Sequence, residues 1–365
     1  MGPQAATPAR GPTVADVIAQ RLSAQLLSGA PAHSPEEVVE RLLAVQAQDP
    51  RGARLSVRSR SAALAAADVD AALSDRRSLV ITWLNRGTLH LVTPQDYWWL
   101  HPLTTPQLAT ANRRRLDQEG VTPAQAERGV QVIVDTIAAL GPQTRHQLRQ
   151  HLDEAGIPTA GQALVHLLLA ASLRAEVVRG PMRGAQHAFV DARQWLGHPP
   201  APCSRDEGLA RLARRYLAGH GPADAADLAK WAGITLGDSR RALDQITDEL
   251  VVGAEGLVDL KEREPAAPLP PPRLLGAFDP LLLGWCSRTP FVGDYAVVTT
   301  NGLFRPCALV DGRVVATWAL SGGALTVRLL EAVSSAVLQA LRADGVELLR
   351  FLGLPGTNVA FTGPP

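Results

Sequence analysis

The sequence contains very little lysine and very little cysteine. Only two of its 36 basic residues are lysines, Lys230 and Lys261, so the other 34 are arginines. The three cysteines, Cys203, Cys286 and Cys307, are far apart and form no CxxC pair. This spacing argues against a disulfide framework and against a zinc site, and we expect neither a metal nor a cofactor. Reduced thiols fit a cytoplasmic protein.

Long apolar runs are also absent. The longest candidate, Leu164 to Ala171, is shorter than the roughly 18 residues that suggest a membrane span, so we expect a buried helix there and no membrane partner. The first dozen residues are rich in alanine and proline and lack the apolar core of a signal peptide, so residues 1–12 are predicted to be a disordered tail. The net charge of +1 predicts nothing about nucleic acid by itself.

Arginine, in contrast, is abundant and clustered. The clusters are Arg51, Arg54, Arg58 and Arg60; Arg113, Arg114 and Arg115; Arg214 and Arg215; and Arg240 and Arg241. Guanidinium groups make bidentate contacts with phosphates, so one interpretation is a basic, DNA-binding face on a neutral protein. Solvated helix faces are the other interpretation. From these clusters we select Arg51, Arg54, Arg58, Arg113 and Arg114 as candidate DNA ligands.

A loose internal repeat indicates the fold. Residues 140–148 and 220–228 each place Gly-Pro after an amphipathic helix, where glycine ends one helix and proline suits the entry to the next. Each segment continues through a helix, a glycine turn, a second helix and a hairpin, which is the order of a winged-helix unit. We therefore predict unit 2 at 121–200 and unit 3 at 205–262. The expected helices include 124–139, 161–171, 207–218 and 236–246, and the expected hairpin strands are 174–179 with 187–190 and 250–252 with 257–260.

A first unit of the same kind is predicted at residues 13–120, with helices at 14–26, 35–45, 53–65 and 67–73. Ser34-Pro35-Glu36-Glu37 is a strong helix start, because Ser34 caps, Pro35 occupies the first turn and Glu37 completes a capping box. Strands at 79–84 and 88–92 flank Asn85-Arg86-Gly87, which is a hairpin signal. Arg86 at this tip is either a DNA contact or a solvated turn residue.

The remaining sequence predicts a linker and a small C-terminal domain. Residues 263–273 are rich in proline and should form a stiff connection. Strands are expected at 295–300, 307–310 and 313–318, a helix at 326–343 and a strand at 346–351. The fold class is therefore α+β: three tandem winged-helix units followed by a β-rich, barrel-like domain at 274–365. Three units in one chain favour a monomer that surrounds duplex DNA over a dimeric regulator.

Two glutamines stand where the helix that begins at Pro35 should end. Asp49 precedes Pro50, which disfavours helical geometry, so the helix should end near Gln46. Side chains two residues apart point the same way only in extended chain, so Gln46 and Gln48 converge if the chain straightens here. Two amides beside four arginines would form a polar cluster facing phosphates. Solvated glutamines at a helix end are the alternative.

Gln46-Ala47-Gln48-Asp49-Pro50, the hairpin at 83–90 and the segments 277–280, 301–306 and 310–315 occur in an order that resembles the AlkZ family of winged-helix DNA glycosylases, which includes the YcaQ-like proteins. The resemblance extends from about residue 13 to residue 355. It implies hydrolysis of the N-glycosidic bond of alkylated purines, particularly bulky N7-alkylguanines. Some members unhook interstrand crosslinks or protect producers of DNA-alkylating antibiotics. The second motif position is acidic in the YcaQ-like branch, so Gln48 favours the AlkZ, self-resistance branch.

The chemistry of two amides fits such a substrate. An N7-alkylguanine already carries a positive charge, so what remains is to position a water and to stabilise an oxocarbenium-like sugar. An amide oxygen can accept from the water but is not a strong base. We therefore predict that Gln46 and Gln48 hold the attacking water. Asp49 either places negative charge near the cation or caps the local backbone, and the second role is favoured.

The scarcity of lysine bears on the reaction type. A bifunctional glycosylase needs an amine nucleophile, and neither Lys230 nor Lys261 is near the glutamines in sequence, although folding could bring one close. We predict a monofunctional glycosylase, without lyase activity, that acts on double-stranded DNA carrying alkylated guanine. The competing class is a non-enzymatic DNA-binding protein, such as a transcription regulator or an architectural protein.

Three further candidates need an interpretation. His90 is interpreted as structural rather than catalytic, although a supporting role at the site stays open. The aromatic residues 97–99 are interpreted as core rather than as base-stacking groups. Arg183 lies beside Met182 on the predicted hairpin of unit 2, where it is a candidate DNA contact.

Overall fold

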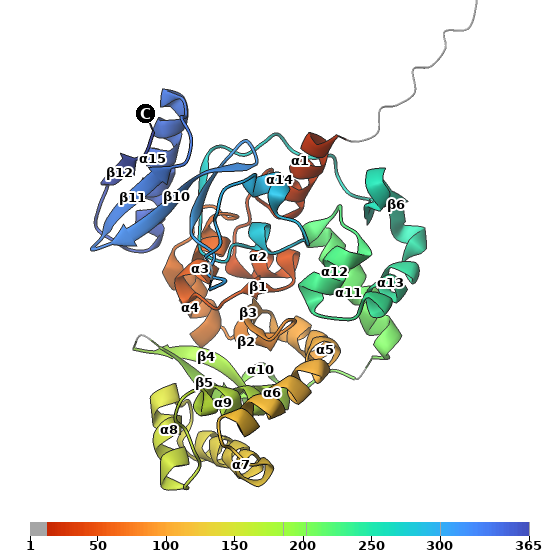
Figure 1. The fold of residues 1–365 in the computed structure, drawn as a ribbon, viewed down its shortest axis with the longest axis vertical. Helices are drawn as coiled ribbons and strands as arrows, with labels where there is room; N and C mark the ends of the chain where they lie inside the picture. The colour runs from red at the N-terminus through yellow and green to blue at the C-terminus, as the bar shows by residue number, and fades with distance from the viewer. Residues whose placement is uncertain (1–12, 185, 202, 300, 365) are drawn as a thin grey trace, which may run out of the picture.

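The computed structural model describes residues 13–184, 186–201, 203–299 and 301–364 (Figure 1). The predicted tail, residues 1–12, lies outside the described residues. The observed mixture of helices and sheets confirms the α+β class.

Short helices form the first part of the chain. The predicted start at Pro35 is confirmed, because the Ser34 hydroxyl accepts a hydrogen bond from the Glu37 N–H (3.2 Å). The prediction that this helix reaches residue 45 is wrong: Leu43 adopts a left-handed φ of 64°, and the helix ends before it. The helices are α1 (Val14–Ala24), α2 (Pro35–Leu42), α3 (Pro50–Arg58) and α4 (Ala66–Ser74).

A five-stranded sheet joins the first two predicted units. The predicted hairpin around Asn85-Arg86-Gly87 is confirmed, with φ of 54° at Asn85 and 80° at Gly87. Ile81 pairs with Arg179, so two hairpins far apart in sequence share one sheet. In spatial order, the strands are β1 (Val45–Gln46), β3 (Thr88–Val92), β2 (Val80–Leu84), β4 (Val177–Arg183) and β5 (Gln186–Asp191).

The middle of the chain is mostly helical. The order of helices and hairpin expected for residues 121–200 and 205–262 is present, while the assignment to winged-helix units and the limits of the units stay predictions. The helices are α5 (Pro94–Thr104), α6 (Pro106–Gln118), α7 (Pro123–Leu140), α8 (Arg145–Glu154), α9 (Ala163–Leu173), α10 (Ala192–Leu196), α11 (Arg205–His220), α12 (Ala225–Ala232) and α13 (Leu236–Asp244). Next come the short helix η1 (Thr247–Glu249), strand β6 (Leu250–Val252), the short helix η2 (Ala254–Gly256) and strand β7 (Val258–Leu260).

The C-terminal region contains a second five-stranded sheet, and it is open rather than barrel-like. Its strand order is β12-β11-β10-β9-β8, so the outer strands β8 and β12 do not close the sheet. The proline-rich residues before it form neither helix nor strand, and the Ala267 N–H donates to Ser23 Oγ (2.9 Å) at α1. The elements are β8 (Arg273–Leu275), η3 (Pro280–Leu282), α14 (Thr289–Val292), β9 (Cys307–Val310), β10 (Arg313–Ser321), β11 (Ala324–Leu329), α15 (Ser335–Phe351) and β12 (Val359–Thr362).

Three predictions for this region are wrong. Residues 324–329 form a strand and not the start of a helix, because alternate residues face the core. Residues 346–351 continue α15 and do not form a strand. A Cβ at Gly345, inside α15, would come within 2.8 Å of Leu325 and Val359, so the lack of a side chain here lets the helix pack closely on the sheet. The strand expected at 295–300 is reduced, over its described residues 295–299, to a single bridge between Val298 and Phe304, and residue 300 lies outside the described residues.

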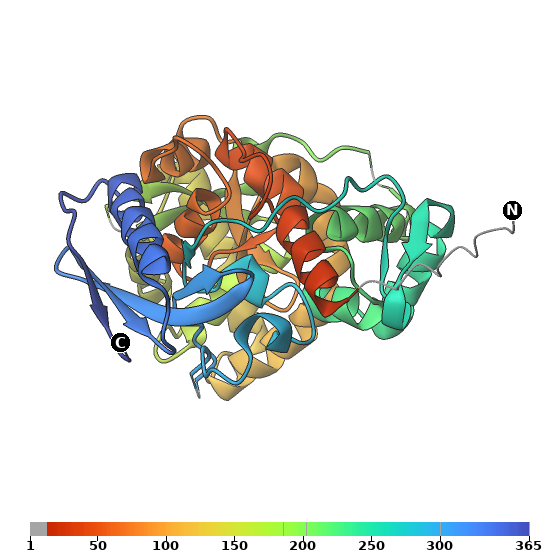
Figure 2. The same cartoon turned by 90° about the horizontal axis from the view of Figure 1, so that it is seen from above.

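Three groups of elements lie on different sides of the molecule. Figure 1 shows α7–α9 at one end of the molecule, the C-terminal sheet with α15 at another, and α11–α13 with β6 on a third side. In Figure 2, α1 lies between α15 and the α11–α13 group. One hydrophobic cluster includes side chains from α2, α9 and β11, so early and late parts of the chain share a core.

Candidate active site

Gln46 and Gln48 lie side by side at the end of the short strand β1. Gln46 is opposite His90 on β3, and the Ala47 N–H donates to the Leu89 carbonyl (2.7 Å). The chain is therefore extended here, as predicted, and the two side chains converge: Gln46 Nε2 donates to Gln48 Oε1 (3.2 Å). Gln46 is buried and Gln48 is exposed, so the pair runs from the interior to the surface.

Asp49 caps a helix. Its Oδ1 accepts hydrogen bonds from the N–H groups of Arg51 (2.8 Å) and Gly52 (3.0 Å), at the start of α3. Pro50 takes the first helical position, where its missing N–H has no cost. This geometry supports the capping role, since the carboxylate is engaged by backbone donors. The cap fixes the direction of the chain immediately after the two glutamines.

Arg86 orients the glutamine pair from the β2–β3 turn. Its guanidinium donates to the carbonyl oxygens of Trp231 (2.9 Å) and Lys230 (3.2 Å) and, in a long contact, to Gln46 Oε1 (3.4 Å). Burial lowers the pKa of Arg86, and the nearby charge of Arg288 lowers it further. The Arg86 contact at Gln46 Oε1 and the Gln46 contact at Gln48 Oε1 together fix both amides in one orientation. Each amide oxygen has a second lone pair that remains available to a water.

His90 is paired with Gln46 across strands β1 and β3, and its side chain is buried. Burial is the main cause that lowers the pKa of His90 to about 3, and the nearby charge of Arg86 lowers it as well. A hydrogen bond to the Thr88 carbonyl acts in the opposite direction and raises the pKa. The ring is therefore neutral near pH 7, and its Nδ1–H donates to the Thr88 oxygen (2.9 Å). Because His90 does not line the pocket described next, the structure favours the structural interpretation.

The glutamines open into a pocket of about 320 Å³. Three regions of the chain line it: the end of β1 with the β2–β3 turn, helix α12, and the segment from residue 278, just before η3, to residue 304, before β9. Its basic and amide residues are Gln46, Gln48, Arg86, Lys230, Arg288 and Asn301, and its larger apolar residues are Phe278, Leu283, Trp285, Leu303 and Phe304. Among the described residues that line the pocket, none is acidic. Strong acid–base chemistry by a carboxyl group therefore has no candidate within this pocket.

Two of the predicted DNA-binding arginines instead hold the fold together. Arg54 forms a hydrogen-bonded ion pair with Asp70, and Arg58 pairs with Asp344 (2.6 Å) on α15. Arg60, in the same cluster, pairs with Asp279 (2.8 Å), and both side chains are fully buried. Helix α3 places Arg54 and Arg58 toward the interior, and Arg60 lies just after its end, so the selection of Arg54 and Arg58 as DNA ligands is corrected.

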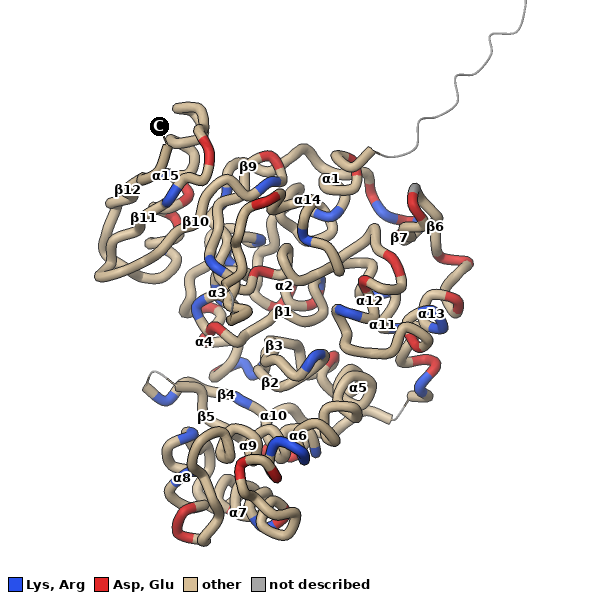
Figure 3. Tube along the Cα trace, viewed as in Figure 1, with Lys and Arg blue, Asp and Glu red and all other residues tan. Residues whose placement is uncertain are grey.

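Of the other predicted arginines, Arg86 is half-buried and four are exposed. Arg51 follows the Asp49 cap, Arg113 and Arg114 lie on α6, and Arg183 lies at the end of β4. Figure 3 shows a run of basic residues on α6, while acidic and basic residues alternate over much of the chain. Their exposure allows contact with DNA, which stays a prediction for these four residues. Tyr97 and Trp99 are buried and Trp98 is partly buried, so the interpretation of these aromatic residues as core is supported.

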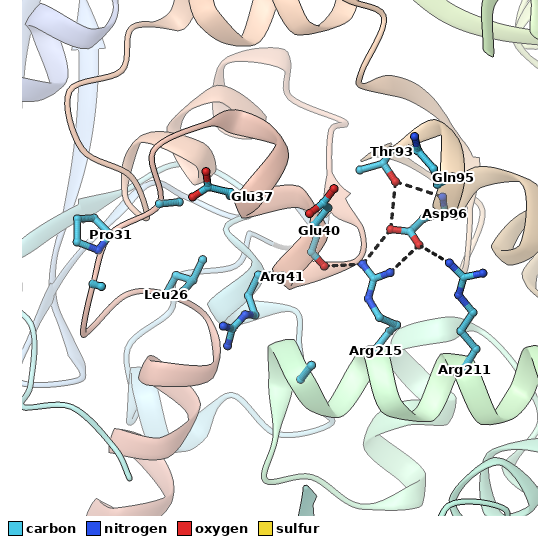
Figure 4. Close-up of a pocket in the computed structure, with 13 residues that line it drawn as sticks. Leu26, Pro31, Glu37, Glu40, Arg41, Thr93, Gln95, Asp96, Arg211 and Arg215 are labelled. Atoms are coloured by element: carbon cyan, nitrogen blue, oxygen red, sulfur yellow. Dashed lines mark hydrogen bonds and ion pairs between the residues drawn. The ribbon is translucent and has the colours of Figure 1, made fainter. Parts of the chain in front are cut away.

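A larger pocket of about 520 Å³ lies between α2, α5 and α11, and its charges are balanced. The Asp96 carboxylate forms ion pairs with Arg215 (2.7 Å) and Arg211 (3.5 Å), as Figure 4 shows. Glu37 and Glu40 also line this pocket, near Arg41. This arrangement differs from the glutamine pocket, where cations are present without acidic partners.

Several pocket residues were not predicted as site residues. Lys230, Trp285 and Arg288 approach the glutamines only through long-range folding, and no local pattern marks them. Phe278 and Asn301 lie in segments whose family resemblance was noted, so that resemblance could have identified them. Within the described ranges, no three His, Cys, Asp or Glu side chains gather as a metal site, and no helix is long and apolar enough to cross a membrane.

The pocket combines oriented neutral amides with several cations, an arrangement suited to a protein that acts on a polyanion such as DNA. The family model for AlkZ-like DNA glycosylases matches residues 39–351, so this chain belongs to that family and is a DNA glycosylase. The family resemblance noted in the sequence is thereby confirmed.

Two further comparisons, one of sequence and one of structure, point to Streptomyces sahachiroi. An interstrand DNA cross-link repair glycosylase is 29% identical over 371 residues, covering 91% of this chain and 97% of that protein. The solved structure of the DNA glycosylase AlkZ has a TM-score of 0.76 at 24% identity, covering 97% of this chain and all of that one. The second comparison confirms the fold over nearly the whole chain.

Proposed function

We propose that this glycosylase hydrolyses the N-glycosidic bond of cationic alkylpurines in double-stranded DNA, especially bulky N7-alkylguanine adducts or interstrand crosslinks. The observation that carries the proposal is the oriented Gln46–Gln48 pair in a pocket without a carboxyl group. Such a site lacks a strong acid for an uncharged base, so it suits a leaving group that is already cationic. The similarity to the S. sahachiroi cross-link repair glycosylase supports the same substrate class.

The reaction requires little from the protein beyond positioning. The free lone pairs of Gln46 Oε1 and Gln48 Oε1 accept hydrogen bonds from one water and direct its oxygen at the sugar C1′. The C1′–N bond breaks, and its electron pair neutralises the charge on the alkylpurine. The water oxygen bonds to C1′ and its proton passes to solvent. The products are the neutral alkylpurine and an abasic site.

We propose that the enzyme has no lyase activity, and Lys230 makes this proposal open to a direct test. Folding brings Lys230 into the glutamine pocket, where Nζ donates to the Cys286 carbonyl (3.1 Å). A Schiff base between Lys230 and the abasic product would be trapped by borohydride as a covalent protein–DNA adduct. We expect no adduct with the wild-type enzyme. An adduct that Lys230→Met abolishes and Lys261→Met retains would show that the enzyme is bifunctional.

A single incubation tests the proposed substrate. Duplex DNA with N7-alkylguanine should release the modified base, seen as strand cleavage at the new abasic site, whereas undamaged DNA should release none. A transcription regulator or architectural protein would release no base and would prefer particular undamaged sequences. Absence of product on both small and bulky adducts would contradict the proposal. The proposed setting is the cytoplasm, as a monomer, in repair or in self-resistance to a DNA-alkylating natural product.

A further inference from the structure

The glutamine pocket concentrates positive charge from three distant parts of the chain. Arg86 comes from the β2–β3 turn, Lys230 from α12, and Arg288 from the residue before α14. All three line the same pocket as Gln46 and Gln48. The pocket therefore brings together cations that have no proximity in sequence.

These cations have carbonyl and aromatic contacts but no ion pair with an acidic side chain among the described residues. Arg86 and Lys230 donate to main-chain carbonyl oxygens, and the Arg288 guanidinium lies over the Phe304 ring, 5.0 Å from its centroid. The charge of Arg288 helps to lower the pKa of Arg86, so the two guanidinium groups repel each other. The buried Arg58 and Arg60, and the arginines near Asp96, each have a carboxylate partner instead.

A repulsive cluster of this kind is stabilised by an anion from outside the chain. These cations do not stabilise a cationic base or an oxocarbenium-like sugar, so their partner is an anionic part of the substrate. The phosphates that flank the target nucleotide are the anions that must come nearest when its sugar meets the glutamines. Phosphate contacts fix the register of a protein on DNA, and arginine and lysine are suited to them.

We propose that Arg86, Lys230 and Arg288 bind the backbone phosphates beside the lesion, and thereby place the Gln46–Gln48 pair at C1′ of the damaged nucleotide. This proposal rests on the proposed function, because it takes the glutamines to act on a nucleotide in DNA. Lys230 is a positioning residue in this scheme. It has two further N–H donors besides the one bonded to Cys286.

The chain offers a clean test, because Lys230 and Lys261 are its only lysines. Lys261 lies outside the pocket, and its Nζ donates to the Asp248 carbonyl (2.6 Å). The probe is a duplex with a single tetrahydrofuran abasic-site analogue, and the dissociation constant is measured as a function of salt. Lys230→Met should reduce the slope of log K against log salt by about 0.9, the value for one lost phosphate contact. Lys230→Arg should retain the slope, and Lys261→Met should not change it.

A footprint of the wild-type protein gives a second readout that does not depend on a variant folding. The probe duplex should protect Lys230, and not Lys261, from acetylation by an amine-reactive ester, as measured by mass spectrometry. The phosphate proposal would be overturned if Lys230→Met kept the wild-type salt slope. It would also be overturned if the duplex left the acetylation of Lys230 as unchanged as that of Lys261. Neither experiment requires catalysis. Failure to release an alkylated base would therefore contradict the proposed function alone.

Discussion

At the scale of single residues, the surroundings of His90, which is paired with Gln46 across two strands, set its protonation state. His90 has a pKa of about 3, chiefly because it is buried. The folded protein thus takes up this proton at lower pH than the unfolded chain, whose histidine has a pKa of 6.5. The stability that His90 contributes is present above pH 6.5 and is lost as the pH falls from about 6.5 toward about 3.

We therefore expect His90→Gln to reduce the acid sensitivity of the fold. Between pH 7 and pH 5, the wild type should lose about 2 kcal/mol more unfolding free energy than the variant, following 1.4 kcal/mol per pH unit for one proton. Urea unfolding at both pH values measures this difference. His146→Gln is the matched control, because His146 is exposed, and it should behave as the wild type. Equal acid sensitivity in His90→Gln and the wild type would contradict the account.

The sequence predicts the glutamine pair better than it predicts the surroundings of the pair. Convergence of Gln46 and Gln48 follows from local rules, since Pro50 disfavours helix just before it. The positions of Lys230 and Arg288 depend on packing between segments far apart in sequence, which no local rule contains. The same limit explains why Arg54 and Arg58 were wrongly predicted to bind DNA. Clustered arginines in a sequence resemble a DNA-binding face, and only the fold shows their carboxylate partners.

At the scale of elements, α3 has to begin at a fixed place for the glutamines to converge. Gly52, in its first turn, packs against the loop before η3, and a Cβ at this position would lie 2.3 Å from the Ala277 carbonyl oxygen. Backbone cannot yield as a flexible side chain can. The tight contact therefore fixes α3, and with it the Asp49 cap and the end of β1.

Gly52→Ala should displace α3 and lower both stability and rate. Overpacking of this kind costs about 1–3 kcal/mol, and we expect a lower melting temperature and a slower single-turnover rate of base release. Gly237→Ala is the matched control, because Gly237 is also helical and the nearest atom to its added Cβ is Thr235 Oγ1 at 3.8 Å. The explanation fails if both variants keep the wild-type rate and melting temperature.

Elements that are encoded by a few neighbouring residues were predicted well. Elements whose structure depends on packing against distant segments were not. The Ser34 cap and the Asn85-Arg86-Gly87 hairpin are encoded within a few residues and are confirmed. The strand at 324–329 and the helix through 346–351 were exchanged in the prediction. The apolar residues of both segments are spaced in a way that fits a helix or a strand. Only the pairing of residues 324–329 in the sheet and the close packing of α15 at Gly345 decide between the two. The joining of two hairpins through Ile81 and Arg179 likewise has no local signal.

At the scale of the whole molecule, buried ion pairs connect the glutamine region to the C-terminal region. Arg60 and Asp279 are 219 residues apart and fully buried, and Arg58 reaches Asp344 on α15. The Arg60–Asp279 pair holds the segment after Gly276 against the residues that follow α3. The same segment contributes Phe278 to the glutamine pocket.

Asp279→Asn should destabilise the entire fold. It leaves the Arg60 charge without its partner in the interior, for which a loss of about 3–5 kcal/mol is expected. Glu127→Gln is the control, because the Arg174–Glu127 pair is largely exposed and its loss should cost at most about 1 kcal/mol. Denaturant unfolding of both variants gives the comparison, and similar small losses in the two would show that the buried pair does not stabilise the fold.

The central claim is that Gln46 and Gln48 perform the chemistry, and single-turnover base release from an N7-methylguanine duplex tests it most directly. With enzyme in excess, Gln46→Ala and Gln48→Ala should each reduce the rate by roughly 10²-fold or more, as expected for loss of water positioning. Gln131→Ala, at an exposed glutamine on α7, should keep the wild-type rate. Rates within about twofold of the wild type in both pocket variants, with DNA binding unchanged, would contradict the account.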